Sequence, residues 1–348
     1  TPVRQNYRTN IYGSLLTTQN AFKVEIAPAF EDEFNTEVVG GAIVKMDENG
    51  NVVCLTPALP KGVTAEDLQG KGGVALDAEG NPFYFDATGD AINQAMKQCS
   101  EIYFTPNSTI TVRSHIMQIP QSGITVHGNG ATISGQEQDF SIQNTYIEGS
   151  TVNVNINNLN GVKVWGSPTG KITFNINLTN CTMKGNGLAD GAHSLVMTRG
   201  NDNGATVNIN LQGCYMENGK DGIHSIYGGT MVFNNCTFKD VVVPINIAKR
   251  SNQQTAHISV TNCTFNTCSI SPTETSNSAY NYAAPVRVVD NGGPANSITL
   301  LVDNCTFTDT QSEWDVLLMD YRDGKTWFPV KYTISNCTPA NPTVKATE

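Results

Sequence analysis

Short runs in which apolar and polar residues alternate fill most of the chain after Glu101. Typical runs are 206–211, which reads Thr-Val-Asn-Ile-Asn-Leu, and 258–261, which reads Ile-Ser-Val-Thr. Successive side chains of a β-strand point to opposite faces, so an alternation with a period of two indicates strands that are buried on one face only. The pattern therefore predicts an all-β structure for this part of the chain.

A short block follows these runs six times and sets the length of the repeat. In its full form the block reads Asn-Cys-Thr-Phe, and every variant keeps the cysteine. Successive cysteines are 33, 22, 27, 42 and 32 residues apart, and the shortest interval is about one turn of a three-sided solenoid. Strands that return in this way predict a right-handed parallel β-helix, in which equivalent residues of successive turns stack. The blocks lie at 180–183, 213–216, 235–238, 262–265, 304–307 and 336–338.

Each residue of the block has a predicted place. The Cys and the Phe or Met two residues later point inward, and the Thr between them points outward. The Asn is expected at a bend, where it tolerates the left-handed conformation and its amide bonds the bend backbone of a neighbouring turn. Stacked cysteines lie about 4.8 Å apart, which does not suit a disulfide, so we predict buried free thiols. Most blocks are also Asn-x-Thr glycosylation sequons, but their periodicity favours the stacked arrangement.

Residues before 101 follow other patterns. Two runs, 43–53 and 74–85, each place Asp-x-x-Gly-Asn between apolar segments, which predicts two β-hairpins. Apolar residues at helical spacing predict a short helix at 88–99, capped by Asp86 or Thr88, that covers the first turn of the solenoid. The chain then divides into a segment 1–37, a β-hairpin region 38–86 and a β-helix 87–348.

Composition and charge narrow the classes of function. Only 15% of the 348 residues are charged, against roughly 25% in an average soluble domain, as expected of extracellular β-proteins and carbohydrate binders. The net charge of −10 is spread thinly with no basic stripe, which argues against nucleic acid as a partner. No apolar run approaches the roughly 20 residues of a membrane helix. The start at Thr1 fits a mature form whose leader has been removed.

Two stretches of the chain carry family resemblances. The helix entry Asp90–Ala95, the run Gly123–Ile133 and the Asn-Cys-Thr-Phe turns together resemble the pectate-lyase-like β-helix superfamily over residues 101–338. That resemblance implies a fold, and the fold hosts lyases, hydrolases, adhesins and binding proteins alike. Val3–Phe30 resembles the closing strands of fimbrillin-like domains in surface lipoproteins of Bacteroides-type bacteria, although the rest of such a domain is missing. It implies an extracellular or outer-membrane location, with membrane contact only through a lipid anchor lost from this chain.

A second set of equivalent residues lies between the cysteine blocks. Five segments align as a turn residue, Gly or Pro, an apolar residue, a variable residue and a small or apolar residue, and 314–318 is a weaker sixth. Because the third and fifth positions point inward, the fourth points outward. Insertions such as Ser269–Ala283 would wall a groove beside this face. The predicted ligand-binding ladder consists of Lys163, His193, His224, Asn246 and Arg287, whose groups suit a polysaccharide.

The same strands carry an enzymatic alternative. Asp221–His224 resembles the Asp-Gly-Ile-His stretch of polygalacturonases, which would make Asp221 a general acid with Asp190 and His224 beside it. The paired Asp-Asp, the Gly-His-Gly and the Arg-Ile-Lys of that family are absent. A lyase would need calcium carboxylates facing a base such as Lys163 or Arg287, and no Asp-rich turn lies beside either. Alternatively, Asp190 and Asp221 are turn residues that bond the backbone.

These observations favour a cell-surface or secreted β-helix protein that is adhesin-like or binds a polysaccharide or a host or cell-surface glycan. The alternative is a hydrolase or lyase that acts on an acidic polysaccharide. No cofactor or metal is assigned, with calcium left open as a bound ion. Further polar and aromatic candidates, interpreted as loop and rim residues, are Asp290, Asp320, Arg322, Trp314 and Trp327.

Overall fold

Parallel strands make up most of the structure, which is a computed structural model. It describes residues 37–39, 41–77, 79–112, 117–135, 139–142, 146–185, 194–198, 204–249, 255–269, 283–290, 297–320 and 330–346. The fimbrillin-like stretch Val3–Phe30 lies outside this part of the chain, as do Asp190, His193, Arg322 and Trp327.

The longest sheet has eleven strands within the described residues. Its strands, in spatial order, are β5 (Pro82–Phe85), β4 (Gly73–Leu76), β6 (Glu101–Phe104), β9 (Ile124–His127), β12 (Thr151–Asn157), β14 (Thr173–Thr179), β17 (Thr206–Gln212), β20 (Gly229–Asn234), β23 (Ala256–Thr261), β26 (Ile298–Asp303) and β29 (Lys331–Ser335). All neighbouring strands from β6 to β29 are parallel, whereas β4 pairs antiparallel with both β6 and β5.

The second sheet has nine strands in the described part of the chain, and all its neighbouring pairs are parallel. Four residues of the predicted ligand-binding ladder, Lys163, His224, Asn246 and Arg287, lie on strands of this sheet. Its strands are β8 (Met117–Gln118), β11 (Asp139–Ile142), β13 (Lys163–Gly166), β16 (Val196–Thr198), β19 (Asp221–Ser225), β22 (Val243–Lys249), β25 (Val286–Asp290), β28 (Val316–Asp320) and β30 (Val344–Ala346).

The third sheet is narrow and follows the cysteine blocks. Isolated parallel bridges from Thr132 through Asn160 to Thr182 extend it to an earlier pair of strands. Its five strands are β15 (Thr182–Lys184), β18 (Tyr215–Glu217), β21 (Thr237–Lys239), β24 (Thr264–Asn266) and β27 (Thr306–Thr308), and the earlier pair is β7 (Thr109–Thr111) and β10 (Thr132–Ser134).

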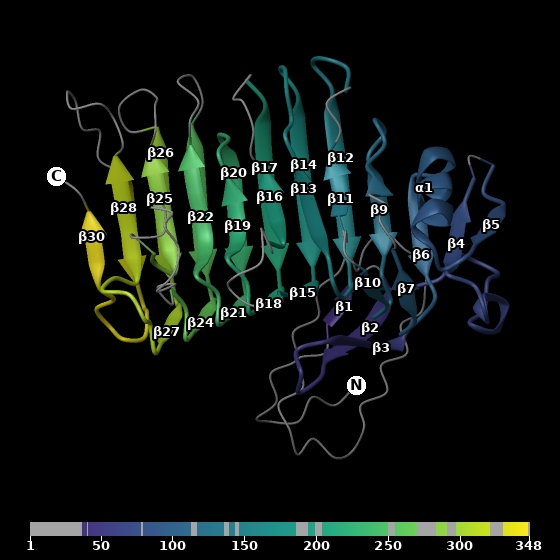
Figure 1. Ribbon diagram of the computed structural model, residues 1–348, viewed down its shortest axis with the longest axis horizontal. Coiled ribbons are helices and arrows are strands. Elements are labelled where there is room, and N and C mark those ends of the chain that lie inside the picture. Colours follow the sequence, from purple (N-terminus) through teal and green to yellow (C-terminus); the bar gives the residue numbers. More distant parts are fainter. Residues whose placement is uncertain are drawn as a thin grey trace, which may run out of the picture.

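The chain visits the three sheets in turn. It runs from β14 to β15 to β16 and returns at β17, which pairs in parallel with β14. The next turn, β17 to β18 to β19, returns at β20 in the same way. Figure 1 shows these strands side by side along the length of the molecule. The predicted parallel β-helix is therefore confirmed, and its right-handed winding stays a prediction.

Asparagines of the cysteine blocks form the bends. Asn180 and Asn262 have φ angles of 49° and 56°, in the left-handed region that Asn tolerates better than most residues. The Asn180 Nδ2 donates to Asn158 Oδ1 at 3.2 Å, and the Asn304 Nδ2 donates to Asn262 Oδ1 at 2.7 Å. The bends are therefore as predicted, except that these amides bond side chains of neighbouring turns instead of bend backbone.

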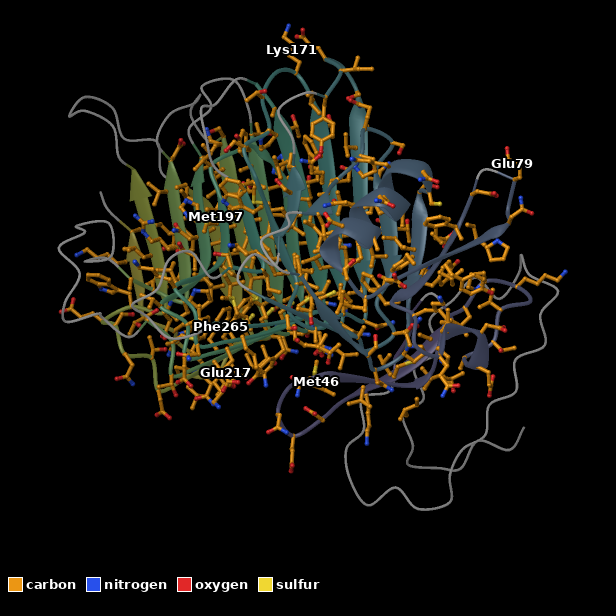
Figure 2. All side chains as sticks on the ribbon, turned by 45° about the vertical axis from the view of Figure 1, so that its right-hand side comes forward. Met46, Glu79, Lys171, Met197, Glu217 and Phe265 are labelled. Carbon is orange, nitrogen blue, oxygen red and sulfur yellow. The ribbon has the colours of Figure 1, made fainter. Side chains whose placement is uncertain are left out.

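The interior is filled by stacks of equivalent side chains. Phe265 lies between Phe238 and Phe307, with ring centroids 5.4 and 5.0 Å apart and nearly parallel planes. All three rings are buried, whereas the neighbouring Thr264 is half-exposed. Figure 2 shows Phe265 within the packed side chains and Glu217 at their lower border. The predicted inward and outward positions of the block are thus confirmed.

The cysteines of the blocks are buried free thiols, as predicted. All nine cysteines of the chain are free and buried. Each block thiol lies against backbone carbonyls: Cys214 Sγ donates to Leu178 O at 3.5 Å and to Gln212 O at 3.7 Å. Burial raises the pKa of the Cys214 and Cys236 thiols well above the ordinary value. These thiols consequently serve packing and are poor nucleophiles.

Helix α1 (Gly89–Gln98) covers the first turn, at the end opposite the C-terminus (Figure 1). Thr88 caps it by accepting a hydrogen bond from the Ala91 N–H at 3.3 Å, so Thr88 and not Asp86 is the cap. Ile92 and Met96 are buried against the core. The predicted cap helix is confirmed, with a boundary one residue shorter at each end.

Both predicted hairpins form. The first consists of β2 (Ala42–Met46) and β3 (Val52–Thr56), and a third strand, β1 (Glu37–Val39), pairs with the other edge of β2. The second consists of β4 and β5. Asp47 Oδ1 accepts hydrogen bonds from the N–H groups of Asn49 and Asn51, at 2.9 and 2.7 Å. Asp77 makes the equivalent bonds in the second turn. The carboxylates are therefore occupied by turn backbone, as expected of the hairpin interpretation.

Side-chain amides attach the first hairpin to the solenoid. Asn160 accepts from the Val52 N–H at 2.8 Å and donates to the Val52 carbonyl at 2.9 Å. Asn107 makes the same pair of bonds with Cys54, and Asn129 with Ala58. These amides occupy backbone groups of β3 and of Ala58, just after it, that would otherwise form an open edge.

Candidate functional site

The register of the nine-stranded sheet defines one column of residues on its outer face. His224 of β19 pairs with Asn246 of β22, and Asn246 pairs with Arg287 of β25. These three residues therefore stack in one column as predicted, and their role in ligand binding stays a prediction. Along successive turns, the column reads Gln118, Ser141, Trp165, Met197, His224, Asn246, Arg287, Leu317 and Lys345.

The two earliest members of the predicted ladder do not belong to this column. Lys163 pairs with Asp139 and lies two residues before Trp165 on the same face of β13. In the next turn the column position belongs to Met197 of β16, and His193 lies outside the described residues. Alternation reveals which residues share a face, but Lys163 and Trp165 satisfy it equally well. The hydrogen-bond register, which selects Trp165, is not visible in the sequence.

Asn246 connects two charged residues from neighbouring strands. Its Nδ2 donates to Asp221 Oδ1 at 3.1 Å, and its Oδ1 accepts from Arg287 Nη1 at 2.7 Å. A carboxylate only accepts and a guanidinium only donates, so these two neighbours fix the amide in one orientation. Asn246 is also 5% exposed, which excludes water as a competitor for most of its surface. The sequence pattern did not reveal this bridge.

His224 lies on the other side of Asp221. Its Nδ1 is 3.4 Å from Asp221 Oδ2, and the His224 side chain is 19% exposed against 4% for that of Asp221. Asp221 Oδ1 thus accepts a hydrogen bond from Asn246, whereas Oδ2 lies near His224 Nδ1 without a hydrogen bond between them. The result is a chain of side chains, His224–Asp221–Asn246–Arg287, that crosses three strands. We call it the polar chain below.

The outer face around the polar chain is less open than an exposed ladder would be. Met197 and Leu317, which continue the column on both sides, are each 1% exposed. Trp165, His224 and Arg287 are half-buried. Exposure therefore varies along the outward-facing column, and its half-buried members are the ones that a ligand could contact. Figure 2 shows where Met197 lies.

The remaining candidates from the sequence have other surroundings. Trp314 is half-buried beside a small outer cluster of Ala248, Val289 and Leu317, and Lys345 Nζ lies 4.3 Å from the centroid of its ring. Asp290 lies at the end of β25 and is 2% exposed, so its interpretation as a loop or rim residue is wrong. Asp320 ends β28, and its backbone pairs with that of Asp290.

A hollow of about 340 Å³ lies on the outer face of the eleven-stranded sheet, between β20 and β29. Its lining combines hydroxyl groups with Leu301 and two basic residues, His257 and Lys331. His257 Nδ1 is 2.9 Å from Thr299 Oγ1. The lining of the hollow contains Lys331 and no carboxylate.

A further polar cluster lies near the capped end. His127 Nε2 is 2.8 Å from Glu101 Oε1, and the His127 ring stacks on Tyr103 with centroids 4.3 Å apart. Burial, followed by the nearby Glu101 carboxylate, raises the pKa of Tyr103. Tyr103 packs beneath Leu68 in a small apolar cluster. The contacts of His127 with Glu101 and Tyr103 join β9 to β6, in the eleven-stranded sheet and away from the polar chain.

Among the described residues, no three His, Cys, Asp or Glu side chains gather closely enough to hold a metal ion. No helix in that part of the chain has the length and apolar character of a membrane span.

Comparisons with known proteins found no match. No protein-family model matches the chain, and no curated protein and no solved structure matches it. The likenesses to pectate-lyase-like and fimbrillin-like proteins therefore stay resemblances of short motifs. The parallel β-helix itself is carried by the strand pairing described above.

Proposed function

We propose that this protein is a cell-surface or secreted, adhesin-like β-helix protein that binds an acidic glycan on the outer face of its nine-stranded sheet. The observation that carries the proposal is the bridge made by Asn246 between Asp221 and Arg287. The bridge holds a guanidinium at a defined place on a face where neighbouring turns present unlike polar groups.

The chemistry of the half-buried residues suits a sugar acid. Arg287 donates from Nη1 to Asn246, and a guanidinium is a planar fork of donors of the kind that matches a carboxylate or sulfate. His224 offers an imidazole two turns away from Arg287, and Trp165 offers a large aromatic surface with one polar end. Successive turns are spaced by about 4.8 Å, so these groups contact an extended ligand at regular intervals.

Binding explains Asp221 better than hydrolysis does. A general acid must reach the glycosidic oxygen of its substrate. Asp221 is 3% exposed, and its two oxygens face Asn246 and His224. We therefore assign Asp221 to the positioning of Asn246. The alternative, a hydrolase or lyase acting on an acidic polysaccharide, would need a second acid such as Asp190.

A panel of neutral and acidic glycans tests the proposal. We expect binding of uronic acid or sulfated glycans, weakened by added salt because screening at physiological ionic strength acts beyond roughly 8 Å. Arg287→Ala should weaken this binding, and Arg287→Lys should restore only part of it, since a lysine lacks the fork. Lys331→Ala, in the hollow of the other sheet, is the matched control and should leave binding unchanged.

Three results would contradict the proposal. The first is an absence of binding across the panel. The second is the reverse pattern, in which Lys331→Ala weakens binding and Arg287→Ala does not, because it would move the site to the hollow. The third is release of reducing ends or of unsaturated products from an acidic polysaccharide, which would establish the enzymatic alternative.

A further inference from the structure

Accessibility alternates from turn to turn along the column on the outer face of the nine-stranded sheet. Buried members and accessible members follow one another without exception over the nine strands described. The buried members, each no more than 5% exposed, are Ser141, Met197, Asn246 and Leu317. The accessible members, each half-buried or exposed, are Gln118, Trp165, His224, Arg287 and Lys345.

This alternation sets the distance between the groups that a ligand can reach. Neighbouring strands lie about 4.8 Å apart, so the accessible members recur about every 9.6 Å. Arg287 and Lys345 are two of them, and Leu317 lies between them in the column. His224 lies at the same spacing on the other side of Arg287, beyond Asn246. Three basic side chains are thus evenly spaced, two strand spacings apart.

The turns between these basic side chains disfavour a negative charge. Asn246 Nδ2 donates to Asp221 Oδ1 at 3.1 Å, so an anion placed over Asn246 would lie close to the Asp221 carboxylate. Leu317, in the other gap, has no polar group in its side chain, and an anion pressed against it would lose water without gaining a partner. Repulsion and desolvation of this kind are how a site rejects the wrong ligand.

Lys345 is held in the column by an aromatic contact. Its Nζ lies 4.3 Å from the centroid of the Trp314 ring, which is a cation–π arrangement. Its backbone pairs with Leu317, and the residue is half-buried. Because the ring already restricts the ammonium group, less conformational freedom remains to be lost when an anion binds. Arg287 is likewise held, through its bond to Asn246.

We propose that the ligand is an acidic polysaccharide with a disaccharide repeat, in which every second sugar carries a carboxylate or a sulfate. The inference rests on the proposed function and names the class of glycan. One sugar of an extended chain advances by nearly one strand spacing, so a chain lying along the column presents its charged sugars two strand spacings apart. These sugars meet His224, Arg287 and Lys345, and the neutral sugars between them pass over Asn246 and Leu317.

Two unsulfated polymers of matched length separate this pattern from simple attraction of charge. Chondroitin carries a uronic acid on every second sugar, and polygalacturonate carries one on every sugar. We expect chondroitin to bind more tightly by about five-fold or more in calorimetric titrations, although polygalacturonate has twice the charge. The reason is that polygalacturonate places additional carboxylates over the turns of Asn246 and Leu317.

Short chondroitin oligosaccharides measure the spacing directly. A disaccharide carries one acid and a tetrasaccharide carries two. Lys345→Ala should therefore weaken binding of the tetrasaccharide by about two- to five-fold and have a smaller effect on the disaccharide, which Arg287 can hold alone. Lys163→Ala is the matched control, because Lys163 is a half-buried lysine of the same sheet that lies outside the column. It should leave the binding of both oligosaccharides unchanged, and thermal unfolding verifies that each variant is folded.

The outcomes distinguish this inference from the proposed function. If neither chondroitin, nor polygalacturonate, nor a sulfated glycan binds, the proposed function fails and the inference fails with it. The inference alone is overturned if Arg287→Ala weakens binding but polygalacturonate binds as tightly as chondroitin. It is also overturned if Lys345→Ala leaves binding of the tetrasaccharide unchanged, or if Lys163→Ala weakens it as much as Lys345→Ala does.

Discussion

Two regions on the outer faces of the large sheets have the same strand geometry and different side-chain order. On β12, β14 and β17 of the eleven-stranded sheet, like residues stack: Asn175 Nδ2 donates to Asn153 Oδ1 at 2.8 Å, and Asn208 Nδ2 donates to Asn175 Oδ1 at 2.9 Å. On the nine-stranded sheet the stacked residues differ at every turn, and Asn246 bonds an acid on one side and an arginine on the other.

This difference separates residues that maintain the repeat from residues that depart from it. An amide carries both a donor and an acceptor, so identical asparagines satisfy one another along a parallel sheet. A guanidinium only donates and an ionised carboxylate only accepts, so Arg287 and Asp221 require unlike partners. We infer that repeated columns serve the fold and that non-repeated columns are where a ligand contact is to be sought.

The largest effect expected from this comparison is in the interior. Phe265 belongs to a repeated column and lies between Phe238 and Phe307. Phe265→Ala should lower the free energy of unfolding by about 3–5 kcal/mol, because it leaves a cavity in the stack. Thr264→Ala, one residue away and half-exposed, should stay within about 0.5 kcal/mol. Chemical denaturation measures both, and similar losses at the two positions would contradict the inward and outward assignment.

A smaller effect is expected at the bridge of the non-repeated column. Asn246→Ala removes the bonds to Asp221 and Arg287 and leaves both groups without this partner. We expect a loss of about 1–3 kcal/mol in stability, together with weaker binding of the acidic glycan. Binding is to be measured at a temperature where the variant is fully folded. A variant that binds as well as the wild type would remove Asn246 from the proposed site.

The sequence predicted the repeated parts of the molecule well. The cysteine blocks gave the bends, the buried thiols and the inward phenylalanines, because identical residues at fixed places leave one consistent arrangement. The hairpin turns and the cap helix were also predicted, since Asp-x-x-Gly-Asn and helical spacing are local signals.

The candidate site was predicted only in part, for a physical reason. His224, Asn246 and Arg287 share a column as expected, but Trp165 replaces Lys163 because alternation fixes a face and leaves the register open. The burial of Lys249 was missed, since a lysine at the end of a strand is ordinarily at the surface. Its position beside Asp290 depends on the pairing of turns separated by a long insertion.

A repeated column on the outer face should respond differently from Asn246. Asn177→Ala interrupts the amide column, in which Asn177 Nδ2 donates to Asn155 Oδ1 at 2.9 Å. We expect a loss of about 1 kcal/mol in stability and no change in glycan binding. Thermal unfolding and the binding assay for the Asn246 variant provide the measurements. If Asn177→Ala weakened binding as much as Asn246→Ala does, repeated and non-repeated columns could not be assigned to separate roles.

The smallest effect concerns the last two strands of the eleven-stranded sheet, β26 and β29, where a charged residue, Asp303, pairs with Ser335. Asp303 Oδ1 accepts hydrogen bonds from Ser335 Oγ at 2.7 Å and from Asn336 Nδ2 at 2.8 Å. These bonds, that of Ser335 first, hold the pKa of Asp303 below its ordinary value of 3.8. A depressed pKa means that the carboxylate stabilises the folded state fully above the ordinary value and loses this contribution as pH falls through the lowered value.

The protection of the β29 amides against hydrogen exchange, corrected for the intrinsic rate at each pH, should therefore decrease below about pH 4. Asp303→Asn keeps an acceptor oxygen and does not titrate, so its protection should change less over the same range. The Phe265 stack in the neighbouring turns serves as the internal reference, because no ionisable group contributes to it. Equal acid sensitivity in the wild type and in Asp303→Asn would show that the last turn is held by its backbone pairing with β26 alone.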